Sequence, residues 1–250
     1  MLTIIQSILL GIVQGITEWL PVSSSGHLVL LQNFLSINVP VVYDIMLHIG
    51  TLIPVIFIFR KEIMDLVKSF FKMKFHDIGL ILVASVVTAI ICFSFLKFFE
   101  SLFSSTTAVG VGLIVTGIFL LASKFFHGNR KISFADAVII GIAQGLAIVP
   151  GISRSGTTIS VGLMRKIDKK TIFTFSFILS IIAVIGAQAV EMKNFSLADI
   201  SITSLLAGIA AAAVVGYIAI KILAKMLVSE KFHLFAYYCF AAGLAVLLFL

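Results

Sequence analysis

Residues 11–26 read GIVQGITEWLPVSSSG, and residues 141–156 read GIAQGLAIVPGISRSG. The two stretches align without a gap at an offset of 130 residues. Seven of the sixteen aligned positions are identical, where a biased composition would give roughly two. Each stretch interrupts an apolar segment with glycine, serine and proline, so each half is too short to cross a bilayer. We therefore expect two broken helices related by an internal repeat; a shared bias toward glycine and serine is the alternative explanation.

The composition of the 250 residues excludes a water-soluble protein. Hydrophobic residues make up 60% of the chain and charged residues 12%, whereas globular proteins average about 45–50% and about 25%. Long apolar runs such as Ile200–Ile220 indicate helices, because in lipid the backbone must satisfy its own hydrogen bonds. A soluble enzyme, a disordered chain and a disulfide-stapled secreted module are excluded. We predict an all-α polytopic membrane protein forming a single membrane domain over residues 1–250.

Six segments are long and apolar enough to span a bilayer, and two further segments are broken in the middle. The predicted spans are 41–59, 78–96, 107–126, 171–190, 200–222 and 234–250, and the predicted re-entrant hairpins are 1–35 and 134–164. With this arrangement, 15 of the 18 basic residues fall in loops on one side, which the positive-inside rule makes cytoplasmic. The hairpins then enter from opposite faces and meet near the membrane centre. Residues 1–126 and 134–250 are predicted to form an inverted-topology repeat.

The first hairpin tip carries an acid, three hydroxyls and an imidazole within ten residues. These are Glu18, Ser23, Ser24, Ser25 and His27, with Gly26 between the last two. An ionisable residue within the membrane is costly and is a functional candidate by default. Glu18 could instead sit at headgroup level, His27 could be an interfacial anchor, and the serines could simply cap a helix. In the repeat alignment Glu18 faces Ile148, so the acid is specific to this tip.

The second tip carries the features of an anion site. Arg154 lies in the break, away from the basic loops, and guanidinium binds phosphate through two parallel donors. The other candidates are Gly151 and Gly156, which allow close backbone approach, and Ser153, Ser155 and Thr157, which offer hydroxyl donors. A half-helix beginning near Ser155 would add its free N–H groups and positive dipole end. The alternative is that Arg154 only extends its side chain to the membrane surface and binds no ligand.

Together the two tips predict phosphoryl transfer on a lipid phosphate at membrane depth. Such chemistry needs positioning and charge neutralisation above all. Glu18 or His27 could take a proton from Ser24 or from water. The carboxylate could also hold a divalent ion that bridges two phosphates. His48 and Asp44, on the first predicted span, are either further partners of this site or interfacial residues.

The motifs QGITEWLPVSSSGH (residues 14–27) and PGISRSGTT (residues 150–158) resemble the two signatures of the bacitracin-resistance type undecaprenyl-diphosphate phosphatases. The matching layout covers essentially the whole chain. The resemblance implies hydrolysis of undecaprenyl diphosphate to undecaprenyl phosphate, which recycles the lipid carrier for peptidoglycan synthesis and confers bacitracin resistance. It places the catalytic acid on Glu18, the serine on Ser24, the histidine on His27 and the arginine on Arg154. Many members have a second Glu where this chain has Gln14, which makes a two-carboxylate metal site less secure.

The resemblance also sets the remaining expectations. Diphosphate binding is expected at Gln14, Ser23, Ser25, Gly26, Gly151, Ser153, Ser155, Gly156 and Thr157. A divalent cation, Mg²⁺ or Ca²⁺, is expected at Glu18, with no organic cofactor. The expected partners are a polyprenyl diphosphate, the lipid bilayer and, as an open alternative, a second copy of the chain; nucleic acid is not needed to explain the net charge of +7. The expected location is the bacterial cytoplasmic membrane, with the site open to the outer face. The rival hypothesis is a transporter or flippase of a phosphorylated polyprenyl lipid, because inverted repeats and half-helices at the midplane are also features of transporters.

Overall fold

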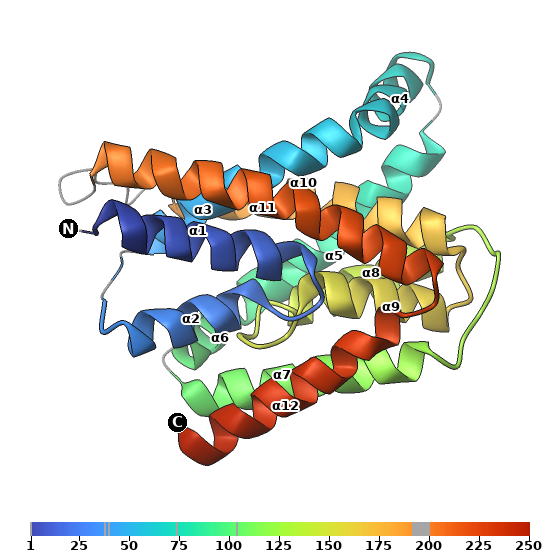
Figure 1. The fold of residues 1–250 in the computed structure, drawn as a ribbon. Helices are drawn as coiled ribbons and strands as arrows, with labels where there is room; N and C mark the ends of the chain where they lie inside the picture. Colours follow the sequence, from blue (N-terminus) through green and yellow to red (C-terminus); the bar gives the residue numbers. More distant parts are fainter. Residues whose placement is uncertain (1, 38, 40, 74, 104, 192–200) are drawn as a thin grey trace.

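The computed structural model describes residues 2–37, 39, 41–73, 75–103, 105–191 and 201–250, and these form a bundle of helices (Figure 1). In chain order the elements are α1 (Ile4–Trp19), α2 (Ser24–Phe34), α3 (Val41–Ile58), α4 (Arg60–Phe71), α5 (His76–Ser94), α6 (Leu96–Leu102), α7 (Thr106–Ser123), α8 (Phe134–Leu146), α9 (Arg154–Met164), α10 (Lys169–Glu191), α11 (Ile202–Val228), the short 3₁₀ helix η2 (Phe232–Leu234) and α12 (Phe235–Phe249). The prediction of an all-α polytopic membrane protein is confirmed.

Five of the six predicted spans are long and apolar enough to cross a membrane by themselves: α5, α7, α10, α11 and η2 with α12. The first predicted span differs. Its helix α3 has 18 residues and continues after a short break into α4, and the two helices are bent by 76° at their junction. The bend falls where the apolar run of α3 gives way to Arg60 and Lys61. A helix that has reached the membrane boundary can turn there and place charged residues in water.

The two broken segments form helix pairs that enter the bundle from opposite ends. In Figure 1, α1 begins at the end that holds the N-terminus and α2 returns toward it, whereas α8 begins at the other end and α9 returns there. Each returning helix is capped by a serine: Ser23 Oγ accepts from Gly26 N at 3.4 Å, and Ser153 Oγ accepts from Gly156 N at 3.1 Å. The same local chemistry therefore restarts the helix after each break.

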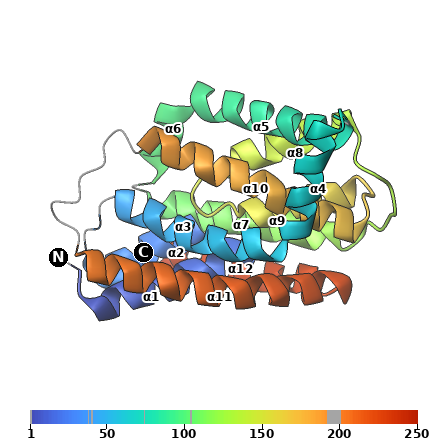
Figure 2. The same cartoon turned by 90° about the horizontal axis from the view of Figure 1, so that it is seen from above.

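Each half of the chain packs its hairpin against a span from the other half, in equivalent ways. α1 lies along α11, and α8 lies along α5, which both Figure 1 and Figure 2 show. At the offset of 130 residues, α1 corresponds to α8, and α11 corresponds to α5. The first helix of each hairpin therefore packs on a span from the other half of the chain. We propose on this packing that residues 1–126 and 134–250 are the two units of an inverted repeat.

Two glycines at repeat-related positions allow these close helix contacts. A Cβ on Gly11 would collide with the backbone carbonyl of Gly208 on α11. A Cβ on Gly141 would lie 2.6 Å from the carbonyl oxygen of Ala84 on α5. Small residues at helix interfaces let the backbones approach closely, which is how membrane helices gain packing energy. The glycine that both copies of the repeat carry at this position is therefore explained by helix packing.

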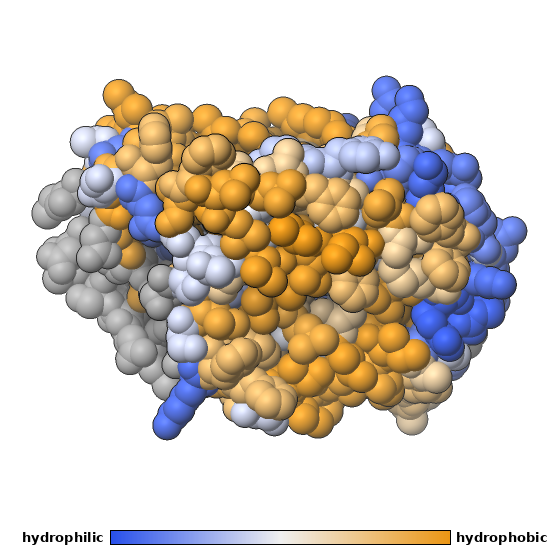
Figure 3. Space-filling model, turned by 90° about the horizontal axis from the view of Figure 1, so that it is seen from below, coloured by the Kyte–Doolittle hydropathy of each residue, from blue (hydrophilic) through white to orange (hydrophobic). Residues whose placement is uncertain are grey.

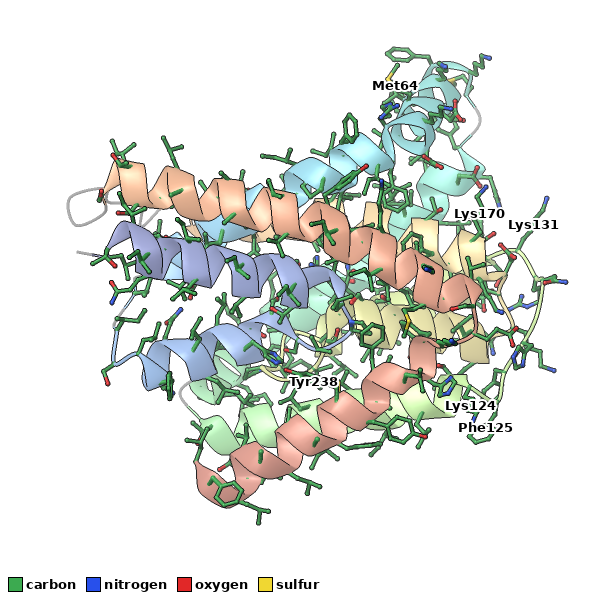
Figure 4. All side chains as sticks on the ribbon, in the orientation of Figure 1. Met64, Lys124, Phe125, Lys131, Lys170 and Tyr238 are labelled. Carbon is green, nitrogen blue, oxygen red and sulfur yellow. The ribbon has the colours of Figure 1, made fainter. Side chains whose placement is uncertain are left out.

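The polar residues of the surface gather at one end of the bundle. Figure 3 shows an apolar band across the middle of one face and most of the hydrophilic residues of that face at one end, and Figure 4 places Lys124, Lys131 and Lys170 at the end near α4. Buried Asp136, in the first turn of α8, is paired there with Arg130 at 2.9 Å and Arg165 at 2.8 Å. These pairs fix the entry of α8 to the loops on either side of the second hairpin.

Asp168 caps α10 at the same end of the molecule. The backbone N–H of Thr171 donates to Asp168 Oδ2 at 2.9 Å, and the Thr171 hydroxyl donates to the same oxygen at 2.9 Å. The backbone hydrogen bond is the main reason that the pKa of the Asp168 carboxyl lies below its ordinary value. The second hairpin is therefore followed at once by a firmly capped span.

Replacing Gly11 by alanine tests the close packing of α1 on α11. We expect Gly11→Ala to lower the free energy of unfolding by about 1–3 kcal/mol, because the added methyl group must displace backbone rather than a flexible side chain. Thermal unfolding of the detergent-solubilised protein measures the effect. Gly186→Ala on α10 is the matched control, since an added Cβ there meets nothing within 4 Å. Equal stabilities for the two variants would contradict the packing argument.

Candidate active site at the meeting of the hairpin tips

The tips of the two hairpins touch through direct hydrogen bonds. Ser23 Oγ accepts from the backbone N–H of Gly151 at 3.1 Å, and Ser155 Oγ donates to the carbonyl of Trp19 at 3.1 Å. Ser23 has a φ of 69° and Gly151 a φ of 91°, so both breaks turn sharply through the left-handed region. Residues more than 120 positions apart in the chain are therefore held side by side, as the sequence predicted for the tips.

An ion pair crosses the junction between the tips. Arg154, the first residue of α9, donates through Nη2 to Oε1 of Glu18, in the last turn of α1. Only 2% of the Glu18 side chain and 19% of the Arg154 side chain are exposed. The guanidinium also donates to the carbonyl of Ser180 at 3.3 Å and lies 5.8 Å from the ring centroid of Trp19. A buried charge needs such a partner, since desolvating an isolated ion is prohibitive.

The second carboxylate oxygen of Glu18 contacts three further polar side chains. Oε2 accepts from Ser24 Oγ at 2.6 Å and from Gln14 Nε2 at 3.1 Å, and it lies 3.2 Å from Nε2 of His48. Gln14 stands one helical turn before Glu18 on α1, while Ser24 opens α2. The carboxylate is thus the centre of the cluster, in contact with a guanidinium, an imidazole, a hydroxyl and an amide.

His48 belongs to this cluster, although the sequence left it open between a site partner and an interfacial residue. Its Nδ1 lies 2.8 Å from the backbone carbonyl of Asp44, one turn earlier on α3, which orients Nε2 toward Glu18. The Asp44 carboxylate itself accepts from Gln32 Nε2 at 2.9 Å and ties α3 to α2. A histidine in an apolar span was the available signal, but the sequence did not reveal its partner.

His27 is directed away from Glu18. Its Nδ1 donates to the carbonyl of Ser23 at 2.7 Å, because a carbonyl oxygen can only accept. Its Nε2 lies 2.6 Å from the hydroxyl of Tyr238, and the two rings stack at 5.7 Å. Tyr238 lies between α12 and α2 (Figure 4), a contact that the sequence did not suggest. The imidazole therefore links the first tip to α12.

Most hydroxyls of the second tip are engaged by backbone. Ser153 Oγ caps α9, Ser155 Oγ bonds to Trp19, and Thr157 Oγ1 donates to the carbonyl of Ser153 at 2.8 Å. Thr116 on α7 adds a further brace, accepting from Ser153 N at 2.9 Å and donating to the carbonyl of Gly151 at 3.0 Å. These groups hold the loop that presents Arg154, rather than reaching toward Glu18.

The remaining members of the predicted binding set lie within the first tip and its contact with the second. Ser25 Oγ is 3.3 Å from Ser23 Oγ. Gly26 lies so close to Gly151 that an added Cβ would be 3.3 Å from its backbone. Gly156 faces Pro21, where a Cβ would be 3.2 Å from the proline ring. The two glycines therefore allow the tips to approach one another.

The residues around Glu18 fit a divalent cation only in part. Within the described part of the chain, no three His, Cys, Asp or Glu side chains are grouped so that they could hold a metal ion. The oxygen Oε1 of Gln14 is buried without a hydrogen-bond partner beside the Glu18 carboxylate. With the Ser24 hydroxyl, these side chains offer only a few oxygen ligands, so an ion there would need further ligands from outside the protein.

This fold and this site define a polytopic membrane protein in which two opposed half-helix tips build a buried polar centre able to bind an anionic group. The chain belongs to the family of the Bacitracin resistance protein BacA, whose family model matches residues 7–245.

Named relatives of this family match the chain over almost its whole length. Proteins called "Undecaprenyl-diphosphatase" from Carboxydothermus hydrogenoformans and Halothermothrix orenii are each 42% identical to it, and the alignments cover 97% and 98% of this chain and 95% and 97% of the relatives. A protein of the same name from Methanosphaera stadtmanae is 39% identical over 99% of this chain and 98% of its own.

A double-mutant cycle tests the pairing of Glu18 with Arg154. We expect Arg154→Ala to lower the free energy of unfolding by about 3–5 kcal/mol, because the buried carboxylate loses its main partner. The double variant Glu18→Gln/Arg154→Ala should lose less than Arg154→Ala alone, since no unpaired charge remains. Thermal unfolding in detergent measures Arg154→Ala, Glu18→Gln and the double variant, with exposed Lys131→Ala as the control. Strictly additive losses would show that the two side chains do not interact.

Proposed function

We propose that this chain is an integral membrane phosphatase that hydrolyses undecaprenyl diphosphate to undecaprenyl phosphate and inorganic phosphate. Membership of the family and the names of three relatives at 39–42% identity support the substrate. The observation that carries the proposal is the cluster of Arg154, Glu18 and Ser24 at the junction of the tips. In a bacterial cell this activity would recycle the lipid carrier for peptidoglycan synthesis and underlie bacitracin resistance.

Arg154 is the proposed anchor for the diphosphate. A guanidinium binds phosphate through parallel charge-assisted donors, and it would exchange Glu18 for the entering phosphate oxygens. Helix α9 begins at Arg154, so its positive dipole end points into the same space. Charge neutralisation of this kind is the main requirement of phosphoryl transfer.

Ser24 is the proposed nucleophile. Its hydroxyl donates to Glu18 Oε2 at 2.6 Å, so the carboxylate is placed to take the proton as Oγ attacks the terminal phosphorus. The new Oγ–P bond forms as the bond from phosphorus to the bridging oxygen breaks, and undecaprenyl phosphate leaves with that oxygen. Water then attacks the phosphoserine, gives inorganic phosphate and returns a proton to Oγ. Gln14 and His48 hold the carboxylate in place during both steps.

A divalent cation, Mg²⁺ or Ca²⁺, is proposed as a second source of charge neutralisation. Glu18 and Oε1 of Gln14 would hold it, together with diphosphate oxygens. When bound, such an ion would offset the negative charge that builds up on the two phosphates. The ion would then be needed for turnover but not for the fold.

The proposed location is the bacterial cytoplasmic membrane, with the site open to the outer face. The end of the bundle that carries Lys124, Lys131 and Lys170 supports a cytoplasmic position for that end (Figure 4). The first hairpin, with Glu18 and Ser24, would then enter from the outer side. A lipid diphosphate released by glycan polymerisation on that side could reach the tips without crossing the membrane.

Phosphate release from a purified, detergent-solubilised sample tests the function. We expect release from a polyprenyl diphosphate, and a loss of about 10²–10³-fold in Arg154→Ala, which removes the anion-binding charge. Lys131→Ala, which removes an exposed basic residue of a loop, should retain activity. A chelator arm tests the cation: release should fall and return on addition of Mg²⁺ or Ca²⁺.

The same assay separates the phosphatase from a lipid carrier. Intact diphosphate after long incubation with folded wild-type protein would overturn the phosphatase and favour the transporter, whose opposed half-helices the chain shares. Release that persists in chelator would overturn the cation proposal alone.

Ser24 and His27 are predicted to behave differently when substituted. We expect Ser24→Ala to abolish measurable phosphate release, because the attacking oxygen is gone, while His27→Gln keeps a substantial part of it. The reason is that His27 contacts Ser23 and Tyr238 rather than Glu18. Steady-state rates on the two purified variants give the comparison, with Tyr238→Phe as a control for the His27 contact. Full activity in Ser24→Ala would instead assign the attack to water or to His27.

A further inference from the structure

Helix α4 (Arg60–Phe71) stands apart from the rest of the bundle. It bends by 76° from α3, and none of its residues is fully buried. In Figure 1 it stands above the bundle near the end that carries the basic loops, and in Figure 2 it runs across the direction of the other helices. If the spans run along the membrane normal, α4 runs along the membrane surface.

The side chains of α4 divide into three stripes. Ile63 and Leu66 face the bundle and pack against its core. A second stripe of Met64, Val67, Phe70 and Phe71 is apolar and exposed, with exposed fractions of 47–78%. The third stripe carries Lys61, Asp65 and Lys68, which recur at the three- to four-residue spacing of one helix face. A helix in water would gain nothing from the second stripe, so something of apolar character should cover it.

Two observations identify what covers this stripe. Ile56 and Phe57, near the end of α3 that leads into α4, are also apolar and exposed, at 46% and 58%. The polar side is basic, since Arg60, Lys61, Lys68 and Lys72 outnumber Glu62 and Asp65.

We propose that α4 is an interfacial helix that binds an anionic lipid surface, with Met64, Val67, Phe70 and Phe71 inserted at the boundary of headgroups and acyl chains. The lysines and Arg60 then meet lipid phosphates. Amphipathic helices of this composition bind membranes through apolar insertion and attraction to anionic lipid. Met64 lies at the outer edge of the molecule in Figure 4, as this placement requires.

Helix α4 is also connected to the candidate active site, because it continues from α3, which carries His48. A helix held at the membrane surface fixes the depth of α3, and so the position of the imidazole that touches Glu18. Insertion of α4 can be measured by its contact with lipid, without measuring phosphate release. Its outcome is therefore independent of the proposed phosphatase activity.

Quenching of an added tryptophan by brominated lipid measures the insertion. The full chain is reconstituted into vesicles of phosphatidylcholine with and without phosphatidylglycerol, and wild type supplies the background of buried Trp19. We expect Phe71→Trp, on the apolar stripe, to be quenched at least about twofold more than Asp65→Trp, on the charged stripe, by lipids brominated along the acyl chain. Equal quenching of the two variants would overturn the proposal.

Charge variants test the anionic partner. In the Phe71→Trp background, Lys61→Gln/Lys68→Gln/Lys72→Gln should abolish any gain in quenching that phosphatidylglycerol gives. The matched control Lys124→Gln/Lys131→Gln/Lys170→Gln removes the same charge at the same end and should keep that gain. If the particle is instead a dimer that Phe71→Asp separates, and Phe71→Trp is not quenched by lipid, the stripe is covered by a second copy and the proposal fails.

Discussion

The contact of Glu18 with Arg154 is the interaction on which the site depends. Each charge comes from a different hairpin, and neither could be buried alone at this depth without a large desolvation penalty. Pairing them makes both tolerable and fixes the register of the two tips. The other polar groups then divide into two tasks. Ser24, Gln14 and His48 converge on the carboxylate, while the serine and threonine hydroxyls of the second tip brace the backbone from which the guanidinium extends.

Much of this arrangement could be read from the sequence because charge in an apolar chain is a strong signal. The breaks in two apolar segments predicted both hairpins, and the places where the repeat copies differ singled out the two charges: Glu18 stands against Ile148, and Arg154 stands against Ser24. The glycines that match in the repeat, Gly11 and Gly141, proved to be points of close helix contact. Patterns of this kind are local, or linked by a constant offset, and therefore visible without coordinates.

Other features depend on packing that no local pattern encodes. His48 stands in an apolar helix thirty positions after Glu18, and only the way α3 lies on α1 brings Nε2 to the carboxylate. Tyr238 meets His27 across 211 positions for the same reason. A hydroxyl beside an arginine can bind a ligand or cap a helix, and its residue type does not distinguish the two. The sequence did not predict the bend between α3 and α4. An apolar run followed by charged residues is equally typical of a straight span followed by a loop.

The direct bonds between the tips have a consequence for the cell's energy supply. Ser23 with Gly151, and Ser155 with Trp19, interlock two elbows whose contacting groups are almost wholly shielded from water. A junction of this kind leaves its polar groups satisfied by one another rather than by water. A proton or an ion passing between the two elbows would have to break those hydrogen bonds, so we expect the junction to resist leakage along this route.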